Sequence, residues 1–180
     1  MMILHRLRIV QQLFLGAVHN KHGLIAQKKK AGERINSVTA TFRCFPIDTA
    51  FGHMNNASLV TVAELNRWRM FTELDILSVL LKRKALLVVA EQTAIYHKPI
   101  LPMREYIVVS TLKITDDKWF HYVHSFEQHP DDVPDGKKAV KFATVNVKAV
   151  MKEYSGKTVK PSELMSSSPF FEELVTAQID

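Results

Sequence analysis

The spacing of apolar and polar residues predicts one strand, then a long helix, then a series of strands. Residues 37–45 place apolar side chains at every second position, the period of a half-buried strand. From residue 57 to about residue 71 the apolar spacing becomes that of a helix, and residues 74–81 continue as a second short helix. The first half of the chain therefore predicts a strand followed by a helical segment.

The second half of the chain is rich in β-forming residues. Four runs stand out, at residues 86–97, 105–114, 119–128 and 139–151. Their separators KPILPMR, TDDK and HPDDVPDGKK are short and have turn chemistry, which favours antiparallel hairpins over helical crossovers. The predicted fold class is α+β, with one long central helix wrapped by an antiparallel sheet of five or more strands. This is the arrangement of the hotdog fold.

The length of the chain allows one domain with a modest extension. Its 180 residues are 47% hydrophobic, and no internal repeat interrupts them. We divide the chain into a basic N-terminal extension at 1–36, a compact domain at 37–160 and a C-terminal tail at 161–180. The tail is expected to end in a short helix with Ser168 as N-cap and Pro169 at its first position.

The net positive charge of the chain comes from the extension. Residues 1–36 hold seven basic groups and one acidic group, 7 − 1 = +6, so the other 144 residues carry 24 − 7 = 17 basic and 18 − 1 = 17 acidic groups. A body without net charge lacks the basic patch that nucleic acid requires, so we expect no nucleic-acid partner. Cys44 is the sole cysteine, which excludes an intrachain disulfide and favours a reducing compartment.

The extension has the pattern of an amphipathic helix. One face would carry Leu4, Leu7, Phe14 and Val18, and another His5, Arg8 and Gln12. A basic segment without an acidic residue before Glu33 is typical of organelle targeting, which predicts a mitochondrial location. The alternative is a basic helix that packs on the domain or is left mobile, with the protein in the cytoplasm. We expect no stable membrane span, because charged and amide side chains interrupt a stretch already shorter than the ~20 apolar residues a bilayer needs.

The segment PIDTAFGHMNNA before the long helix resembles the signature of a known family. The residues that carry the likeness are Asp48, Gly52, His53, Asn55 and Asn56, followed on the helix by Glu64 and Arg67. The segment is similar to hotdog-fold thioesterases of the 4-hydroxybenzoyl-CoA thioesterase superfamily, especially to thioesterase-superfamily-like proteins with an HMNNA stretch and an N-terminal extension. The likeness covers residues 37–160.

The resemblance implies an acyl-CoA thioesterase that hydrolyses acyl-CoA to free acid and CoA without metal or cofactor. Asp48 would act as general base or nucleophile, with His53 and Asn55 orienting water or substrate. The free N–H groups of the helix start, near residues 54–56, would stabilise the oxyanion. Gly52 would let the substrate approach the backbone closely.

Further positions are assigned to substrate binding and assembly. Asn56 joins the oxyanion and substrate site, and Glu64 is placed there too or in a supporting role across a dimer. Lys98 and Arg104 would lie near a CoA phosphate. Such domains pair through a continuous sheet, so the resemblance implies a homodimer or a dimer of dimers with substrate between subunits.

Each of these residues also has a plain structural use. Asp48 and the asparagines can cap turns and helices, His53 can fix the loop, and Glu64 can pair with Arg67 at i,i+3. In the family's usual pattern the aspartate lies four residues before the histidine, where this chain has Thr49. This difference supports a non-catalytic acyl-CoA-binding protein as the alternative function. A third possibility is an enoyl-CoA hydratase, although Ala50 replaces the asparagine of such sites.

Other residues with reactive side chains are predicted to be structural. His121 and His124 are three apart in a strand, so they emerge on opposite faces and cannot share a metal. Cys44 is expected in the core. The aromatic cluster of Trp119, Phe120, Tyr122 and Phe126 is expected in the core or on a dimer surface.

Overall fold

The computed structural model describes residues 2–21, 35–167 and 172. Its helices are α1 (Met2–Lys21), α3 (Asn56–Glu73) and α4 (Ile76–Lys82), with 3-10 turns at Pro46–Asp48, Pro130–Asp132 and Pro161–Ser167. Its strands are β1 (Ser37–Arg43), β2 (Thr49–Ala50), β3 (His53–Met54), β4 (Ala85–Tyr96), β5 (Glu105–Ile114), β6 (Phe120–Gln128), β7 (Lys141–Glu153) and β8 (Thr158–Val159). The predicted tail helix at Ser168 and Pro169 lies outside the described residues.

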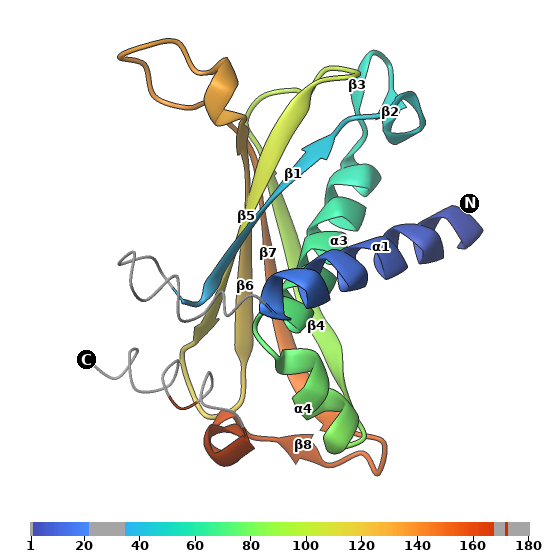
Figure 1. The fold of residues 1–180 in the computed structure, drawn as a ribbon, viewed down its shortest axis with the longest axis vertical. Coiled ribbons are helices and arrows are strands. Elements are labelled where there is room, and N and C mark those ends of the chain that lie inside the picture. The colour runs from blue at the N-terminus through green and yellow to red at the C-terminus, as the bar shows by residue number, and fades with distance from the viewer. Residues whose placement is uncertain (1, 22–34, 168–171, 173–180) are drawn as a thin grey trace.

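The main element of the fold is one curled antiparallel sheet. Its strand order is β1-β5-β6-β7-β4, with β8 added to β7, and every pairing is antiparallel. The helical segment inserted after β1 sends the chain to the opposite edge of the sheet, where β4 has β7 as its one partner strand among the described residues (Figure 1). The α+β fold class and the hotdog arrangement predicted from the sequence are confirmed.

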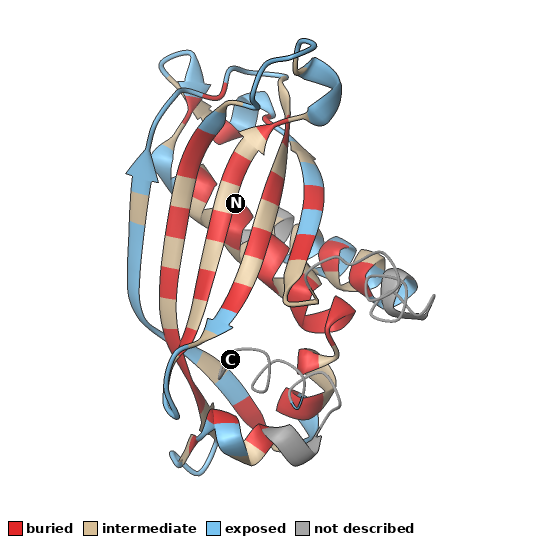
Figure 2. Cartoon of the chain, turned by 90° about the vertical axis from the view of Figure 1, so that its left-hand side faces the viewer, coloured by how far each residue is buried: buried red, intermediate tan, exposed pale blue. Residues whose placement is uncertain are grey.

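The long helix α3 fills the concave side of the sheet (Figure 1). Asn55 caps its start, Leu74 caps its end, and Asp75 follows in the left-handed region with φ 57°. Side chains at helical spacing, including Leu59, Val62 and Met70, are buried against the inward residues of the strands. On β5 and β6 every second residue is buried, which gives the regular bands of Figure 2.

A polar group lies within this apolar core. Asn66 on α3 donates from Nδ2 to Ser110 Oγ at 2.6 Å, and Ser110 Oγ lies 2.6 Å from His124 Nδ1. The Ser110 oxygen can accept from both neighbours or donate its proton to Nδ1, so the direction of its bond to His124 depends on the imidazole tautomer. His124 is fully buried and His121 is half-buried on the other face, as the sequence predicted.

The helix α1 crosses α3 on the side away from the sheet (Figure 1). Gly16 makes the close crossing possible, because a Cβ there would overlap Thr72 Oγ1 and lie 2.8 Å from the Arg69 carbonyl oxygen. The part of the extension that forms α1, residues 2–21, thus packs on the domain. None of the described helices combines the length and the hydropathy needed to cross a membrane.

Candidate functional site

The polar stretch PIDTAFGHMNNA forms a tight hairpin in front of α3. Strands β2 and β3 pair Thr49 with Met54 and Ala50 with His53, so Phe51 and Gly52 form a two-residue turn. Both turn residues have positive φ, 53° and 81°, as a primed hairpin turn requires. Glycine adopts this conformation freely, and the Phe51 side chain is fully exposed. The hairpin therefore projects from the domain with His53 at its returning end.

The hairpin delivers the chain directly into the N-terminus of α3. Asn55 Oδ1 accepts from the Ser58 N–H at 2.8 Å, so Asn55 acts as the N-cap. The Met54 N–H donates to the Ile100 carbonyl at 2.8 Å, and the Asn55 N–H donates to the Asp48 carbonyl at 2.9 Å. These two N–H groups are therefore already hydrogen-bonded and are not available to a substrate oxygen.

The unoccupied donors of the helix start include one predicted position, Asn56, and one position beyond the predicted range, Ala57. Among the described residues, the backbone N–H groups of Asn56 and Ala57 have no acceptor. They lie in the first turn of α3, where the helix dipole favours negative charge. The backbone could therefore polarise a carbonyl oxygen there.

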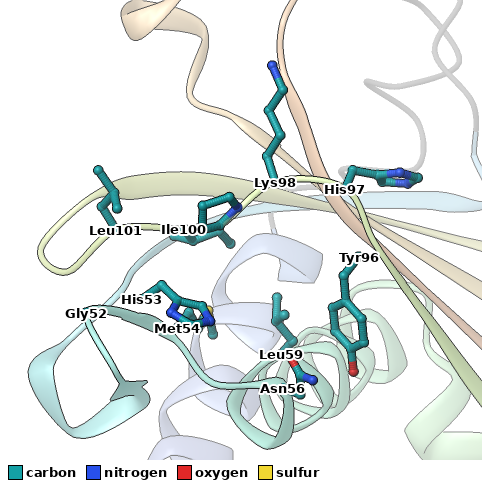
Figure 3. Close-up of a pocket in the computed structure, with 11 residues that line it drawn as sticks. Gly52, His53, Met54, Asn56, Leu59, Tyr96, His97, Lys98, Ile100 and Leu101 are labelled. Carbon is teal, nitrogen blue, oxygen red and sulfur yellow. The ribbon is translucent and has the colours of Figure 1, made fainter.

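A pocket of about 520 Å³ opens between the hairpin, the start of α3 and the segment that follows β4 (Figure 3). Its lining residues are Gly52, His53, Met54, Asn56, Leu59, Tyr96, His97, Lys98, Pro99, Ile100 and Leu101. Tyr96 faces Asn56 and Leu59 in Figure 3, while Lys98 extends away from the interior. The pocket has an apolar floor and basic groups at its mouth, a composition that suits an acyl chain with an anionic carrier.

Several predicted site residues meet in this pocket. Gly52, His53, Asn56 and Lys98 line it. The His53 ring is exposed, and its Nδ1 lies 3.3 Å from the Phe51 carbonyl oxygen. If Nδ1 donates to that oxygen, Nε2 is left as a proton acceptor.

The carboxylate of Asp48 lies outside the lining of the pocket. Asp48 is only 5% exposed, and both of its oxygens bind the guanidinium of Arg8, at 2.9 and 3.0 Å. Its Oδ2 also accepts from the Phe45 N–H at 3.2 Å. The hydrogen bond to Asp48 is the main reason that the pKa of Arg8 is raised. In this structure Asp48 thus anchors α1.

Glu64 lies under α1 as well. Its Oε2 is 3.7 Å from His5 Nε2, and its Oε1 accepts from Trp68 Nε1 at 3.5 Å. The ion pair between Glu64 and Arg67 that the i,i+3 spacing suggested is not formed among the described residues. Arg67 instead places its guanidinium 5.9 Å from the centre of the Tyr122 ring, and burial lowers its pKa. Glu64 does not line the pocket.

The remaining predicted residues fall elsewhere. Arg104 stacks on the Phe142 ring at 5.2 Å, outside the pocket lining. Cys44 is buried in the core, and that burial raises the pKa of its thiol. Within the described residues no group of three or more His, Cys, Asp or Glu side chains could hold a metal ion.

Sequence reasoning missed the second wall of the pocket. Tyr96 ends β4, and His97, Ile100 and Leu101 belong to the turn after it. A 2.8 Å backbone hydrogen bond from Met54 to Ile100 brings this turn to the hairpin. The cluster of aromatic, basic and proline residues in YHKPIL was a signal in the sequence. This signal did not show that YHKPIL lies opposite the hairpin that carries His53.

Comparison with known proteins agrees with this architecture. The family model described as the thioesterase-like superfamily matches residues 33–174. No curated protein matches the chain. The structure resembles the probable thioesterase YbaW from Escherichia coli, with a TM-score of 0.64 and 15% identity over 76% of this chain and 98% of that one.

Two further solved structures share the fold. A 1,4-dihydroxy-2-naphthoyl-CoA thioesterase from Synechocystis gives a TM-score of 0.57 at 11% identity, covering 69% of this chain and 88% of that chain. A 4-hydroxybenzoyl CoA thioesterase mutant complexed with 4-hydroxybenzoyl CoA gives 0.62 at 12% identity, covering 77% and 98%. These matches confirm the predicted hotdog fold, and the family model confirms the resemblance to thioesterases.

Proposed function

The chain belongs to the thioesterase-like superfamily, and from this premise we propose that it hydrolyses acyl-CoA to free acid and CoA. The family assignment supports a thioester hydrolase in general, and the acyl-CoA substrate is our proposal. The observation that carries it is the pair of free N–H groups, on Asn56 and Ala57, at the start of a helix that borders an apolar pocket. No metal or cofactor takes part in the proposed reaction.

The proposed reaction places the thioester carbonyl oxygen at the free N–H groups of Asn56 and Ala57. Each such donor, held in a site that excludes water, can stabilise the oxyanion by ~3 kcal/mol. The acyl group would lie against Leu59, Ile100 and Leu101, while Lys98 at the mouth would meet the anionic CoA. This orientation uses both the polar and the apolar parts of the pocket.

His53 is the proposed general base. Water attacks the carbonyl carbon and gives a proton to His53 Nε2. The tetrahedral intermediate then collapses, the C–S bond breaks, and the leaving CoA sulfur takes that proton. Asp48 could serve instead as base or nucleophile only after exchanging its contacts with Arg8 for a place in the pocket. Asn55 would keep its capping role and orient the loop.

A panel of acyl-CoAs with a thiol-reactive dye tests the proposal. We expect thiol release, and a loss of about a hundredfold or more in kcat for His53→Gln. The matched control is His121→Gln, a half-buried histidine on the outer face of the sheet, which should keep full activity. A loss confined to Asp48→Asn, with its fold intact by circular dichroism, would transfer the role of base to Asp48.

A non-catalytic acyl-CoA-binding protein is the second candidate. The observation that favours it is the Asp48 carboxylate held by Arg8, together with Thr49 at the family's usual aspartate position. Acyl-CoA binding by calorimetry without any thiol release would establish this function over hydrolysis.

Location and assembly are separate proposals. The basic, acid-free N-terminal sequence supports a mitochondrial rather than a cytoplasmic location. Imaging of the full chain with a C-terminal fluorescent tag would test it. For assembly we propose a homodimer, or a dimer of dimers, that joins through the exposed strand β4.

A further inference from the structure

The helix α1 packs with its polar face inward and its apolar face outward. The inward face includes Arg8, which binds Asp48, the buried Gln12, and Gly16 against α3. The outward face carries Leu7 and Val10, each 61% exposed, and Phe14, 68% exposed. A helix on the surface of a domain normally shows the opposite arrangement.

The outward residues form a continuous stripe. Positions 7, 10 and 14 follow the i, i+3, i+7 spacing of one helix face, and Val18 continues it at 37% exposure. Ile47, next to the Asp48 that Arg8 binds, is also 64% exposed. Exposed apolar side chains gathered in this way mark an interaction surface.

The charge around the stripe indicates what would bind it. The sequence of α1 has no acidic residue and includes Arg6, Arg8 and Lys21. Arg6 is exposed, whereas Arg8 lies on the inward face and is paired with Asp48. Residues 1–36 carry a net charge of 7 − 1 = +6, whereas the rest of the chain is neutral. An apolar helix face on a basic extension suits the surface of an anionic lipid bilayer.

A second copy of the chain suits the stripe less well. Two α1 helices face to face would bring two positive extensions together, whereas β4 offers an apolar strand edge for self-association. We therefore propose that the outward face of α1 binds an anionic membrane surface, with Leu7, Val10 and Phe14 inserted among the lipids. The inward contacts with α3 and Asp48 would hold the domain against that surface.

Vesicle sedimentation of the full chain tests this proposal. Vesicles of phosphatidylcholine and phosphatidylserine at about two to one are compared with vesicles of phosphatidylcholine alone. We expect binding to the anionic vesicles, and a partition coefficient about tenfold lower or more for the double variant Leu7→Gln and Phe14→Gln. Raising the salt concentration should weaken the binding.

The matched control is Leu81→Gln, which removes a leucine 69% exposed on α4 and should leave vesicle binding unchanged. Circular dichroism confirms that each variant is folded, since all three side chains are exposed. Wild-type protein that stays in the supernatant, or a double variant that binds as well as wild type, would overturn the proposal. So would a double variant that is defective only in self-association by light scattering.

Discussion

At the scale of single residues, the ion pair of Arg8 and Asp48 connects two parts of the chain that are forty positions apart. The pair is bidentate, and the Asp48 side chain is almost completely buried. A buried carboxylate that loses its cation keeps the cost of desolvation without the attraction that offset it. We therefore expect Arg8→Met to lower the free energy of unfolding by about 2–4 kcal/mol, measured by urea denaturation.

The control for this prediction is an exposed ion pair. Arg43 donates to Glu105 at 2.6 Å, but both side chains are well exposed, so Arg43→Met should change stability little. Arg8→Lys keeps the charge and loses the bidentate geometry, so its loss should be smaller than that of Arg8→Met. Equal effects of Arg8→Met and Arg43→Met would show that the Asp48 pair contributes no more than a surface contact.

The buried imidazole of His124 should make the protein sensitive to acid. Burial, followed by the nearby charge of Arg67, lowers its pKa from 6.5 to about 3. Between these values the unfolded chain binds a proton that the folded chain does not. The free energy of unfolding therefore falls as pH falls through this range, by up to ~1.4 kcal/mol per pH unit from this one group.

Urea denaturation at pH 7 and at lower pH measures this slope. His124→Gln keeps a group that can accept from Ser110 but cannot titrate in this range, so the pH dependence due to residue 124 should disappear. An unchanged slope in this variant would assign the acid sensitivity to other groups.

The roles of residues were predicted from the sequence only where local structure determines them. Asn55 as a helix cap follows from its position before an apolar-periodic run. The hairpin turn at Gly52 was not predicted, since Gly52 was assigned only to close approach of the substrate. The partner of Asp48 depends on a helix forty residues earlier, which no local pattern specifies. For the same reason the place of Ile100 in the pocket was not predicted, because a long-range backbone hydrogen bond joins it to the hairpin.

At the scale of elements, the crossing of α1 over α3 depends on Gly16. Alanine would raise the intrinsic helix propensity by about 1 kcal/mol, but its Cβ would overlap Thr72 and crowd the Arg69 carbonyl. We expect the clash to outweigh the gain, so Gly16→Ala should lower the free energy of unfolding by about 1–3 kcal/mol in urea denaturation.

A substitution on the exposed side of the same helix provides the comparison. Gln11 is exposed, so Gln11→Ala changes helix propensity without touching α3 and should keep or slightly raise stability. If Gly16→Ala were as stable as Gln11→Ala, the two helices would not be in close contact in solution.

Element type was predictable because hydrophobic period follows secondary structure directly. The run at 105–114 coincides with β5, and the predicted helix at 57–71 lies within α3. The two-residue strands β2 and β3 were missed, since so short a hairpin leaves no period. For α1 the pattern indicated two faces, but which face packs inward depends on Arg8 and Gly16 meeting specific partners.

At the scale of the whole molecule, the strand β4 forms one edge of the sheet. Within the part of the chain that the structure describes it pairs with β7 alone, and Figure 2 shows it exposed along most of its length at the left-hand edge. Its exposed apolar residues include Val88, Val89 and Ile95. A long apolar edge strand exposes backbone N–H and C=O groups that can pair with another strand unless something covers them. Tyr96, at its end, also lines the pocket, so pairing there would bring a second chain beside the site.

Charges placed on this edge should therefore separate the proposed dimer. We expect wild-type protein to show twice the chain mass of 20.6 kDa by light scattering after size exclusion, and the double variant Val89→Lys and Ile95→Lys to show the single mass. Leu81→Lys adds a charge at an exposed leucine on α4 and should remain dimeric. Because the pocket wall at Tyr96 belongs to the same strand, the monomeric variant should also lose thioesterase activity. Wild-type protein that is monomeric yet hydrolyses acyl-CoA would show that one chain forms the complete site.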